Sequence, residues 1–200
     1  MYAYAWSGRC VQSKGWGKLL SVEADRFVSS DLQRGGGETV RIRAGVIADY
    51  EAVERLHLRC SKSSLYARYN GSRDRLTAAQ WGYFCDADRG VTMVAVPDED
   101  PGRVVAFGNL MRTPSEGVAE LALLVEDSWQ GKGVATRLAD QLLTAAHRLG
   151  FREVETWSIA LNPPARAVLQ RLGAELTRKD GEDHGRLMLP AAGIEEGATR

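Results

Sequence analysis

The feature that most constrains the fold is an apolar, strand-like segment that leads through glycines into a long amphipathic helix. Residues Val118–Val125 are apolar apart from Glu120, and the apolar positions of 132–149 recur at helical spacing. The connection between them ends in the run from Gly131 to Gly133. The first N–H groups of a helix have no intrahelical partners, and the helix dipole adds positive potential there. The segment therefore predicts a strand–loop–helix unit that can bind a phosphate or pyrophosphate.

Two common nucleotide motifs do not match this loop. A P-loop, GxxxxGK[ST], would need glycine at Glu126 and Ser or Thr at Gly133. The dinucleotide fingerprint GxGxxG fails because Thr136 stands in place of the third glycine. The residues alone leave two interpretations open, an anion site of another kind or a tight turn in which the glycines serve only the backbone.

The rest of the chain alternates between strand and helix patterns. We expect strands over 39–43, 91–96, 103–111, Val118–Val125, 153–157, 174–179 and 186–189, and helices over 48–60, 64–69, 77–85, 132–149 and 163–172. Gly150 suits a helix C-cap, and Asn162 suits an N-cap ahead of Pro163. This order predicts an α/β (α+β) fold with a mixed sheet and helices on both of its faces.

Length and charge limit the domain organisation and the partners. A chain of 200 residues is long enough for one ordinary domain, which we place at 39–190. We predict a flexible N-terminal extension over 1–38, which closes with three glycines, and a C-terminal tail over 191–200. Lysine plus arginine and aspartate plus glutamate balance at 26 each. A formal net charge of zero argues against a protein devoted to nucleic acids or anionic membranes.

Cysteine usage and hydropathy suggest a compartment. The three cysteines are far apart and form no CxxC pair, so they suggest neither a disulfide framework nor a zinc site. No apolar run approaches the length of a membrane span, and the N-terminus lacks the pattern of a signal peptide. We therefore expect a reduced, cytoplasmic protein without a metal site.

The glycine loop resembles the cofactor motif of the GNAT superfamily of N-acetyltransferases. In that family a strand ending in valine is followed by Q/R-x-x-G-x-G/A, and Gln130, Gly133 and Ala135 occupy the motif positions here. The family's next landmark is an asparagine that opens the following helix, then Leu-Gly-Ala, which Asn162 and 172–174 match. The resemblance covers roughly residues 39–189. Within the family, the run 64–69 and the placement of Glu120 look most like the bacterial protein-lysine acetyltransferases.

The resemblance implies a cofactor and a division of labour. Acetyl-CoA would be the co-substrate, and the mostly antiparallel sheet would splay between its fourth and fifth strands. The fourth strand would pair with the pantetheine arm, the loop amides would hold the pyrophosphate, and the asparagine would contact the arm. The implied cofactor-binding residues are Leu123, Val125, Gln130, Gly131, Lys132, Gly133, Val134, Ala135, Thr136 and Asn162. Asn162 can equally serve only as a helix N-cap.

Acetyl transfer to an amine needs a proton acceptor, because an amine of pKa near 10.4 is almost fully protonated at neutral pH. Glu120 is the candidate general base, since burial in an otherwise apolar strand would raise its pKa. The protein-lysine branch also carries a glutamate ten residues before the motif glutamine. Two alternatives are that strand alternation turns Glu120 to solvent and that it pairs with an arginine. Glu116, Glu155 and His184 are rival bases.

One position departs from the family pattern. Many members carry a tyrosine seven residues after the motif asparagine as general acid, and this chain has Leu169 there. Either coenzyme A leaves as a thiolate or through water, or Tyr66 or Tyr69 donates, although both tyrosines also suit packing roles. The sequence thus predicts an N-acetyltransferase acting on a protein lysine or a small-molecule primary amine. A non-catalytic acyl-CoA-binding sensor and a nucleotide-binding domain are the alternatives.

Overall fold

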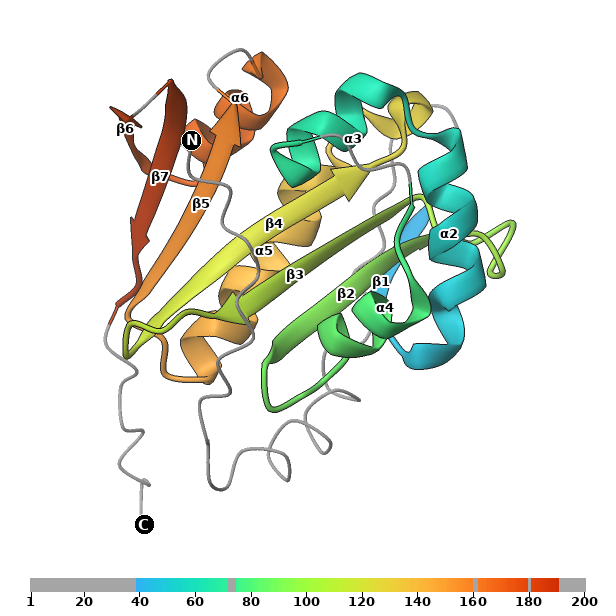
Figure 1. The fold of residues 1–200 in the computed structure, drawn as a ribbon, viewed down its shortest axis with the longest axis horizontal. Helices are drawn as coiled ribbons and strands as arrows, with labels where there is room; N and C mark the ends of the chain where they lie inside the picture. Colours follow the sequence, from blue (N-terminus) through green and yellow to red (C-terminus); the bar gives the residue numbers. More distant parts are fainter. Residues whose placement is uncertain (1–38, 72–74, 160–161, 180, 191–200) are drawn as a thin grey trace, which may run out of the picture.

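The computed structural model describes residues 39–71, 75–159, 162–179 and 181–190 (Figure 1). A seven-stranded sheet has the order β1-β2-β3-β4-β5-β7-β6. The strands are β1 (Val40–Ala44), β2 (Gly90–Pro97), β3 (Ala106–Arg112), β4 (Val118–Val125), β5 (Glu153–Ile159), β6 (Glu175–Lys179) and β7 (Glu182–Met188). Every neighbouring pair is antiparallel except β4 with β5. The predicted mixed, mostly antiparallel sheet is therefore confirmed. The extension and the tail expected over 1–38 and 191–200 lie outside the described residues.

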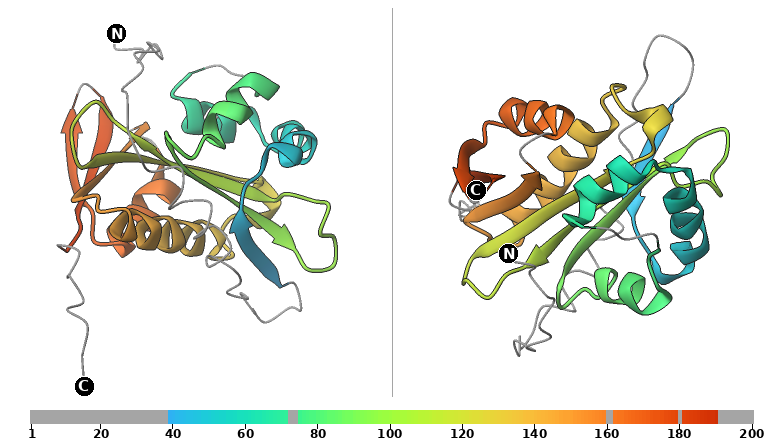
Figure 2. Two further views of the ribbon diagram at one scale, coloured as in Figure 1. Left: turned by 90° about the horizontal axis from the view of Figure 1, so that it is seen from below. Right: turned by 45° about the horizontal axis from the view of Figure 1, so that its top comes forward.

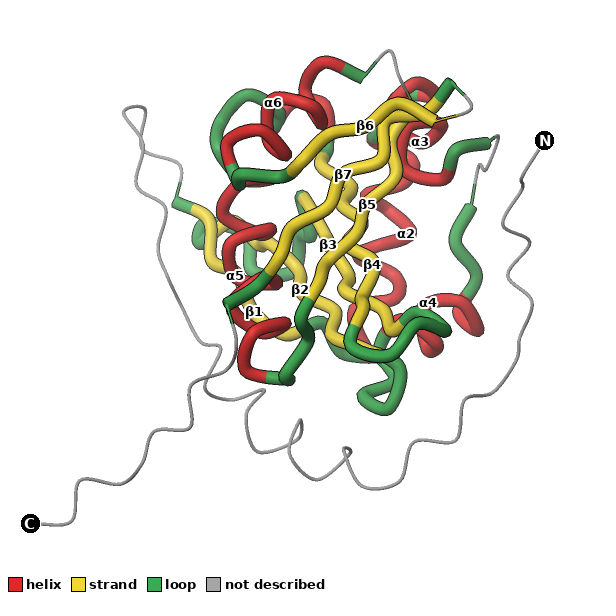
Figure 3. Tube along the Cα trace, turned by 90° about the vertical axis from the view of Figure 1, so that its left-hand side faces the viewer, coloured by secondary structure: helices red, strands yellow, loops and turns green. Residues whose placement is uncertain are grey.

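Helices cover both faces of this sheet. They are α2 (Tyr50–Arg59), α3 (Lys62–Tyr69), α4 (Ala78–Phe84), α5 (Val134–Arg148) and α6 (Pro163–Arg171). Figure 2 shows α2, α3 and α4 on one side of the sheet and α5 on the other. Figure 3, which faces the end of the sheet formed by β5, β7 and β6, shows α6 on the same side as α5. None of the helices in these ranges has the length and apolar character that a membrane crossing needs.

Strand alternation in β4 separates the two layers of core. Ala119, Leu121 and Val125 belong to the cluster beneath α5, whereas Leu124 packs with the cluster beneath α2 and α4. Because successive side chains of a strand point to opposite faces, Glu120 lies on the same face as Leu124. The candidate base therefore faces away from α5.

The predicted boundaries hold closely at α5 and fail at β7. The helix expected over 132–149 begins at Val134, because Gly133 adopts a left-handed φ of 83° as its N-cap, and Gly150 follows its end with a φ of 73°. The last strand starts at Glu182, four positions before the predicted 186. Its polar run concealed it, since the inward residue Asp183 is 4% exposed and pairs with Arg166 at 3.2 Å.

Candidate active site

The parallel pair β4–β5 is short and opens into a gap. The two strands pair only over residues 118–120 of β4 and 153–155 of β5. β4 runs on to Val125 and β5 to Ile159, so the strands part after Glu120 and its partner Glu155 (Figure 1). This confirms the splay between the fourth and fifth strands that the sequence predicted.

The main chain of β4 turns alternate peptide groups towards this opening. The N–H of Glu126 donates to the carbonyl of Val105 at 2.9 Å, so Glu126 and every second residue before it turn their peptide groups towards β3. The residues between them turn their peptide groups towards β5, because the hydrogen-bonding groups of successive residues in a strand point to opposite sides. These residues are Leu121, Leu123 and Val125. An extended chain that carries amides, such as a pantetheine arm, can pair with such an edge as an added strand.

The glycine loop lies at the end of β4 and begins α5. Gly131 and Gly133 both have positive φ values, 70° and 83°. The first helical hydrogen bond runs from the N–H of Arg137 to the carbonyl of Gly133 at 3.1 Å, so the amides of 134–136 precede any helical acceptor. Together with the helix dipole, these amides could bind an anion at the end of β4. The pyrophosphate contact that the sequence predicted is compatible with this geometry and stays a prediction.

Two side chains of the loop have partners within the protein. Nε2 of Gln130 donates to the carbonyl of Val125 at 3.1 Å and to the hydroxyl of Ser64 at 3.0 Å. Nζ of Lys132 lies 4.8 Å from the ring centroid of Trp129. The side chain of Gln130 therefore ties the loop to β4 and α3, and its backbone is the part that can face a phosphate.

Asn162 begins α6, the helix that follows β5. Its Oδ1 accepts a hydrogen bond from the N–H of Ala165 at 3.2 Å, and Pro163 and Pro164 occupy the first turn. The predicted N-cap role is confirmed. A contact between Asn162 and a cofactor arm is compatible with this geometry and stays a prediction.

Glu120 lies at the last residue pair before β4 and β5 separate. Its side chain is accessible to solvent, as one of the alternatives held, and Arg68 of α3 acts on it electrostatically. The alternative that Glu120 pairs with an arginine stays a prediction. Desolvation by the surrounding protein nevertheless raises the pKa of Glu120 above its usual value; Arg68 opposes that rise and Glu155 adds to it. A carboxylate with a raised pKa at the point where two strands separate suits proton abstraction.

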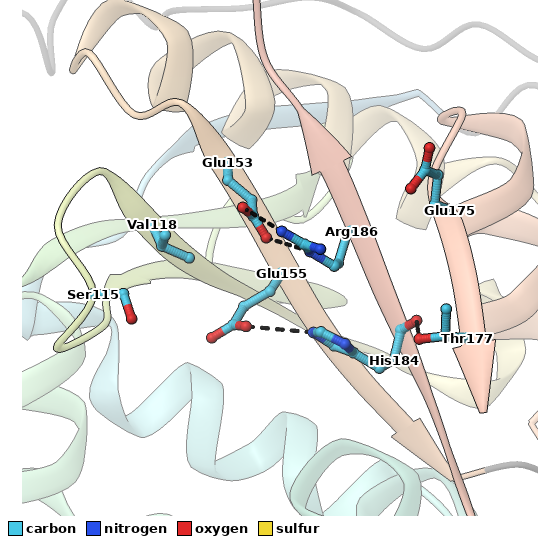
Figure 4. A pocket seen from close by; sticks show the side chains of 8 residues that line it. All are labelled: Ser115, Val118, Glu153, Glu155, Glu175, Thr177, His184 and Arg186. Carbon is cyan, nitrogen blue, oxygen red and sulfur yellow. Dashed lines mark hydrogen bonds and ion pairs between the residues drawn. The ribbon is translucent and has the colours of Figure 1, made fainter. Parts of the chain in front are cut away.

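A hollow of about 400 Å³ lies between the β3–β4 turn and the strands β5, β7 and β6 (Figure 4). Nε2 of His184 is 3.4 Å from Oε2 of Glu155, and the imidazole stacks on Trp157 with centroids 4.0 Å apart. In the same wall Arg186 binds Glu153 through two hydrogen bonds of 2.6 and 2.8 Å. Because Glu155 is the strand partner of Glu120, the structure brings two of the rival bases, Glu155 and His184, next to the preferred one.

The position of the usual tyrosine and the two candidate tyrosines lie in different surroundings. Leu169, which stands at the usual tyrosine position, is 6% exposed within the core. Tyr66 is 48% exposed on α3. The hydroxyl of Tyr69 lies 2.6 Å from Nε2 of His57, whose Nδ1 is 2.7 Å from the carbonyl of Val53. A carbonyl only accepts, so Nδ1 carries a hydrogen, and in the neutral form of the imidazole Nε2 accepts a hydrogen bond from the hydroxyl of Tyr69.

The sequence did not predict the role of the acidic pair that follows β4. Glu126 is 4% exposed and receives hydrogen bonds from Nε of Arg59 at 2.8 Å and from Nη2 of Arg103 at 2.6 Å. Asp127 receives three hydrogen bonds from the start of α3. No periodicity marks such pairs. The available signal was two consecutive carboxylates after an apolar strand, where charge without partners would be costly.

The buried carboxylate of Glu126 predicts a pH-dependent stability. Burial by itself raises the pKa of Glu126, but hydrogen bonds from Arg59, Ser128 and Arg103 lower it overall. The stabilisation is therefore complete above the unfolded pKa, about 4.3, and is lost as pH falls through the lower folded value. We expect Glu126→Gln to lower the free energy of unfolding by about 1–3 kcal/mol at pH 7. Urea titrations should show this difference shrinking below about pH 4.

A matched control for that experiment lies on the exposed side of α2. The carboxylate of Glu51 is 82% exposed and 3.7 Å from Arg55, and an exposed pair of this kind contributes little. Glu51→Gln should leave the unfolding curve within about 0.5 kcal/mol of wild type. A difference for Glu126→Gln that stays constant from pH 7 to pH 3 would contradict the assigned role of the charge.

The described residues hold no group of three or more His, Cys, Asp and Glu side chains that could bind a metal ion. Cys60 and Cys85 are free thiols, and burial raises the pKa of each to about 12. A thiol with so high a pKa is a weak nucleophile at neutral pH. The site chemistry in this part of the chain therefore rests on carboxylates, a histidine and backbone amides.

Comparison with known proteins agrees with this geometry. A family model described as the Acetyltransferase (GNAT) family matches residues 50–174. Acetyltransferase Pat of Mycolicibacterium smegmatis is 28% identical over 146 residues, which are 72% of this chain and 44% of that protein. The chain thus spans less than half the length of that relative.

Solved structures share the fold. The GNAT domain of S. lividans PAT superposes with a TM-score of 0.73 at 24% identity, covering 82% of this chain and 98% of that one. A phosphinothricin acetyltransferase from Sinorhizobium meliloti, determined in complex with AcCoA, gives a TM-score of 0.63 at 20% identity, covering 75% of this chain and 88% of that one. The overall fold is therefore common to these proteins.

Proposed function

This chain belongs to the acetyltransferase (GNAT) family, and on that premise we propose that it transfers the acetyl group of acetyl-CoA to a primary amine. The observation that carries the proposal is the separation of β4 from β5 directly after Glu120 and Glu155. One open strand edge then runs from a carboxylate of raised pKa to an anion site at the glycine loop. Such an edge suits a long, extended cofactor with phosphates at one end and a reactive thioester at the other.

The cofactor would use backbone groups for most of its contacts. The amides from Gln130 to Thr136 would hold the pyrophosphate, and the main chain at Leu123 and Val125 would pair with the pantetheine arm. Asn162 would reach the arm from the start of α6. The S. meliloti relative, which binds AcCoA on the same fold, supports this assignment.

The reaction needs one proton acceptor and no enzyme nucleophile, because the thioester is already activated. As the amine nitrogen bonds to the carbonyl carbon, Glu120 would take the nitrogen's proton, and the carbon–sulfur bond would then break. A backbone N–H on the open edge of β4 would stabilise the oxyanion. The departing thiolate needs no tyrosine, since a thiol pKa near 8.5 lets it leave as an anion and take its proton from water. The presence of Leu169 at the usual tyrosine position is compatible with departure of coenzyme A as a thiolate.

The hollow beside Glu120 suits a cationic acceptor. Glu153, Glu155 and Glu175 line it together with His184 and Arg186 (Figure 4). The carboxylates would attract an ammonium group, and Glu120 would deprotonate it at the opening. A protein lysine and a small-molecule primary amine both meet these requirements.

Two measurements on the wild-type protein test this function. Isothermal titration should show binding of acetyl-CoA, and ATP and NAD should give no comparable heat. A thiol-release assay over a panel of amines and lysine peptides should then show release of coenzyme A that depends on the amine. Tight binding without turnover on any acceptor would favour the non-catalytic sensor. Binding of ATP or NAD instead of acetyl-CoA would favour a nucleotide-binding domain.

A further inference from the structure

Helix α3 is attached at its first turn to the segment that leads into the glycine loop. Its N-cap, Ser61, donates to Asp127 through its N–H at 2.8 Å and through its hydroxyl at 2.7 Å. Ser64 donates to the same carboxylate at 2.9 Å. Nε2 of Gln130 in turn donates to the hydroxyl of Ser64 at 3.0 Å. The start of α3 is therefore positioned by residues 127–130.

At the other end of α3, Arg68 reaches the sheet. Its Nη2 donates to Oδ1 of Asn109 at 2.6 Å, and Asn109 is 1% exposed on β3. Its Cζ lies 5.1, 5.4 and 5.8 Å from the ring centroids of Tyr69, Phe107 and Phe84. A guanidinium that is hydrogen-bonded to a buried amide and bordered by aromatic rings has few alternative positions.

This contact places a positive charge beside the candidate base. The β3–β4 register pairs Asn109 with Ala122 and Met111 with Glu120, so Asn109 and Glu120 are diagonal neighbours on one face. In the described part of the chain, the charged groups that act on Glu120 are Arg68 from α3 and Glu155 from β5. His184 of β7 lies on the far side of Glu155, at 3.4 Å from it.

We propose that Arg68 is a positioning residue for the general base, and that α3 sets its place from the turn that precedes the glycine loop. The inference rests on the proposed role of Glu120. Desolvation and Glu155 both raise the pKa of Glu120, and Arg68 is the group that lowers it. Its charge keeps more of the carboxylate ionised, and thus able to accept a proton, as pH falls. Asp127 and Gln130 contribute by fixing the start of the helix.

The first test is the pH profile of kcat/KM for the acceptor. In Arg68→Met the acid limb of this profile should shift to higher pH by about 0.5–1 unit. The reason is that an opposite charge near a carboxylate lowers its pKa by amounts of this order, and the variant removes that charge. The rate on the acid limb should then fall about 3- to 10-fold, while the rate on the alkaline plateau stays near wild type. Arg68→Lys keeps the charge and should restore part of the shift. An acid limb that stays in place would overturn the proposal.

A second readout does not depend on activity. The carboxyl carbon of Glu120 can be titrated by NMR in protein labelled at glutamate, with Glu120→Gln used for assignment. The titration midpoint should rise in Arg68→Met. If Glu120→Gln keeps full turnover while the midpoint still rises, Arg68 acts on Glu120 as described, but the proposal falls because Glu120 is not the base. If the midpoint does not move, the inference fails whatever the kinetics show.

Two further variants test the role of the turn. Asp127→Ala releases the start of α3 and should move the same midpoint upwards by less than Arg68→Met does. Arg55→Met removes an arginine from α2 whose side chain is 57% exposed, and it should leave the midpoint unchanged. A midpoint unaffected by Asp127→Ala would show that the turn does not set the place of Arg68. Circular dichroism and thermal unfolding confirm that each variant is folded.

Discussion

Glu120→Gln is expected to lower kcat/KM for the amine by about 10²- to 10⁴-fold at pH 7, the range that a positioned general base contributes. The substitution preserves the size of the side chain and removes its ability to accept a proton. Binding of acetyl-CoA should stay within about twofold of wild type, because cofactor contacts are expected at the loop and along the edge of β4. Thiol release measured beside isothermal titration on the same samples separates these two quantities.

The pH dependence of the variant should identify the missing step. Without a base, only acceptor molecules that are already neutral can react, and their fraction rises tenfold per pH unit up to the amine pKa near 10.4. The wild-type rate should instead level off above the pKa of Glu120, which desolvation raises. The two profiles should therefore converge at alkaline pH. A constant ratio between them from pH 6 to pH 10 would contradict the role of proton acceptor.

Glu155→Gln is the matched control, since this residue faces Glu120 across the last β4–β5 pair. It removes a neighbouring carboxylate and the contact with His184, and we expect a loss of about tenfold or less. The opposite order, with the larger loss in Glu155→Gln, would assign proton abstraction to Glu155 and His184. Unchanged turnover in Glu120→Gln would remove the base assignment and leave acetyl-CoA binding untouched.

The parts of the molecule that local patterns could predict are those whose determinants are consecutive in sequence. The apolar strand, the glycines and the amphipathic helix fall within residues 118–149, and β4 and α5 lie there with boundaries within two residues. Asn162 is the N-cap of α6, as its position before Pro163 predicted. The backbone geometry of these elements follows from side-chain size, left-handed glycines and periodicity.

The features that the sequence did not reveal depend on contacts between distant segments. Arg68 and Asn109 are 41 residues apart, and Arg59 meets Glu126 across 67. Neither pair has a periodic signature, because a buried polar side chain needs only one partner and that partner can come from any element. The sequence also suggested that burial would raise the pKa of Glu120. Desolvation does raise this pKa, and Arg68 opposes the rise. Solvent nevertheless still reaches the side chain of Glu120.

The second large effect is expected for Gly131→Asp. Gly131 has a φ of 70°, which aspartate tolerates better than most residues, and a Cβ there would meet no heavy atom within 4 Å. The new carboxylate would lie two residues before the N-cap of α5, where a negative charge stabilises a helix by about 0.3–1 kcal/mol. The strain of a left-handed φ offsets this gain, so the unliganded protein should unfold at or somewhat below the wild-type temperature.

Acetyl-CoA binding should suffer in the same variant, because its pyrophosphate would meet a carboxylate in the anion site. Like charges about 6 Å apart repel by about 3 kcal/mol at an effective dielectric constant near 20, which weakens binding by roughly 100-fold. Screening by salt should reduce the loss, so titrations at low and high ionic strength are expected to differ.

Gly150→Asp supplies the matched control at the opposite end of α5. Gly150 has a φ of 73° and equally open space around a Cβ, but a negative charge at a helix C-terminus is unfavourable. This variant should unfold at a lower temperature than Gly131→Asp does, and it should bind acetyl-CoA like wild type. Because the two variants share the residue type and the backbone conformation, their contrast isolates the position of the charge. If Gly131→Asp binds acetyl-CoA as tightly as wild type does, the pyrophosphate does not lie on this loop, and the anion site at the start of α5 loses its assigned role.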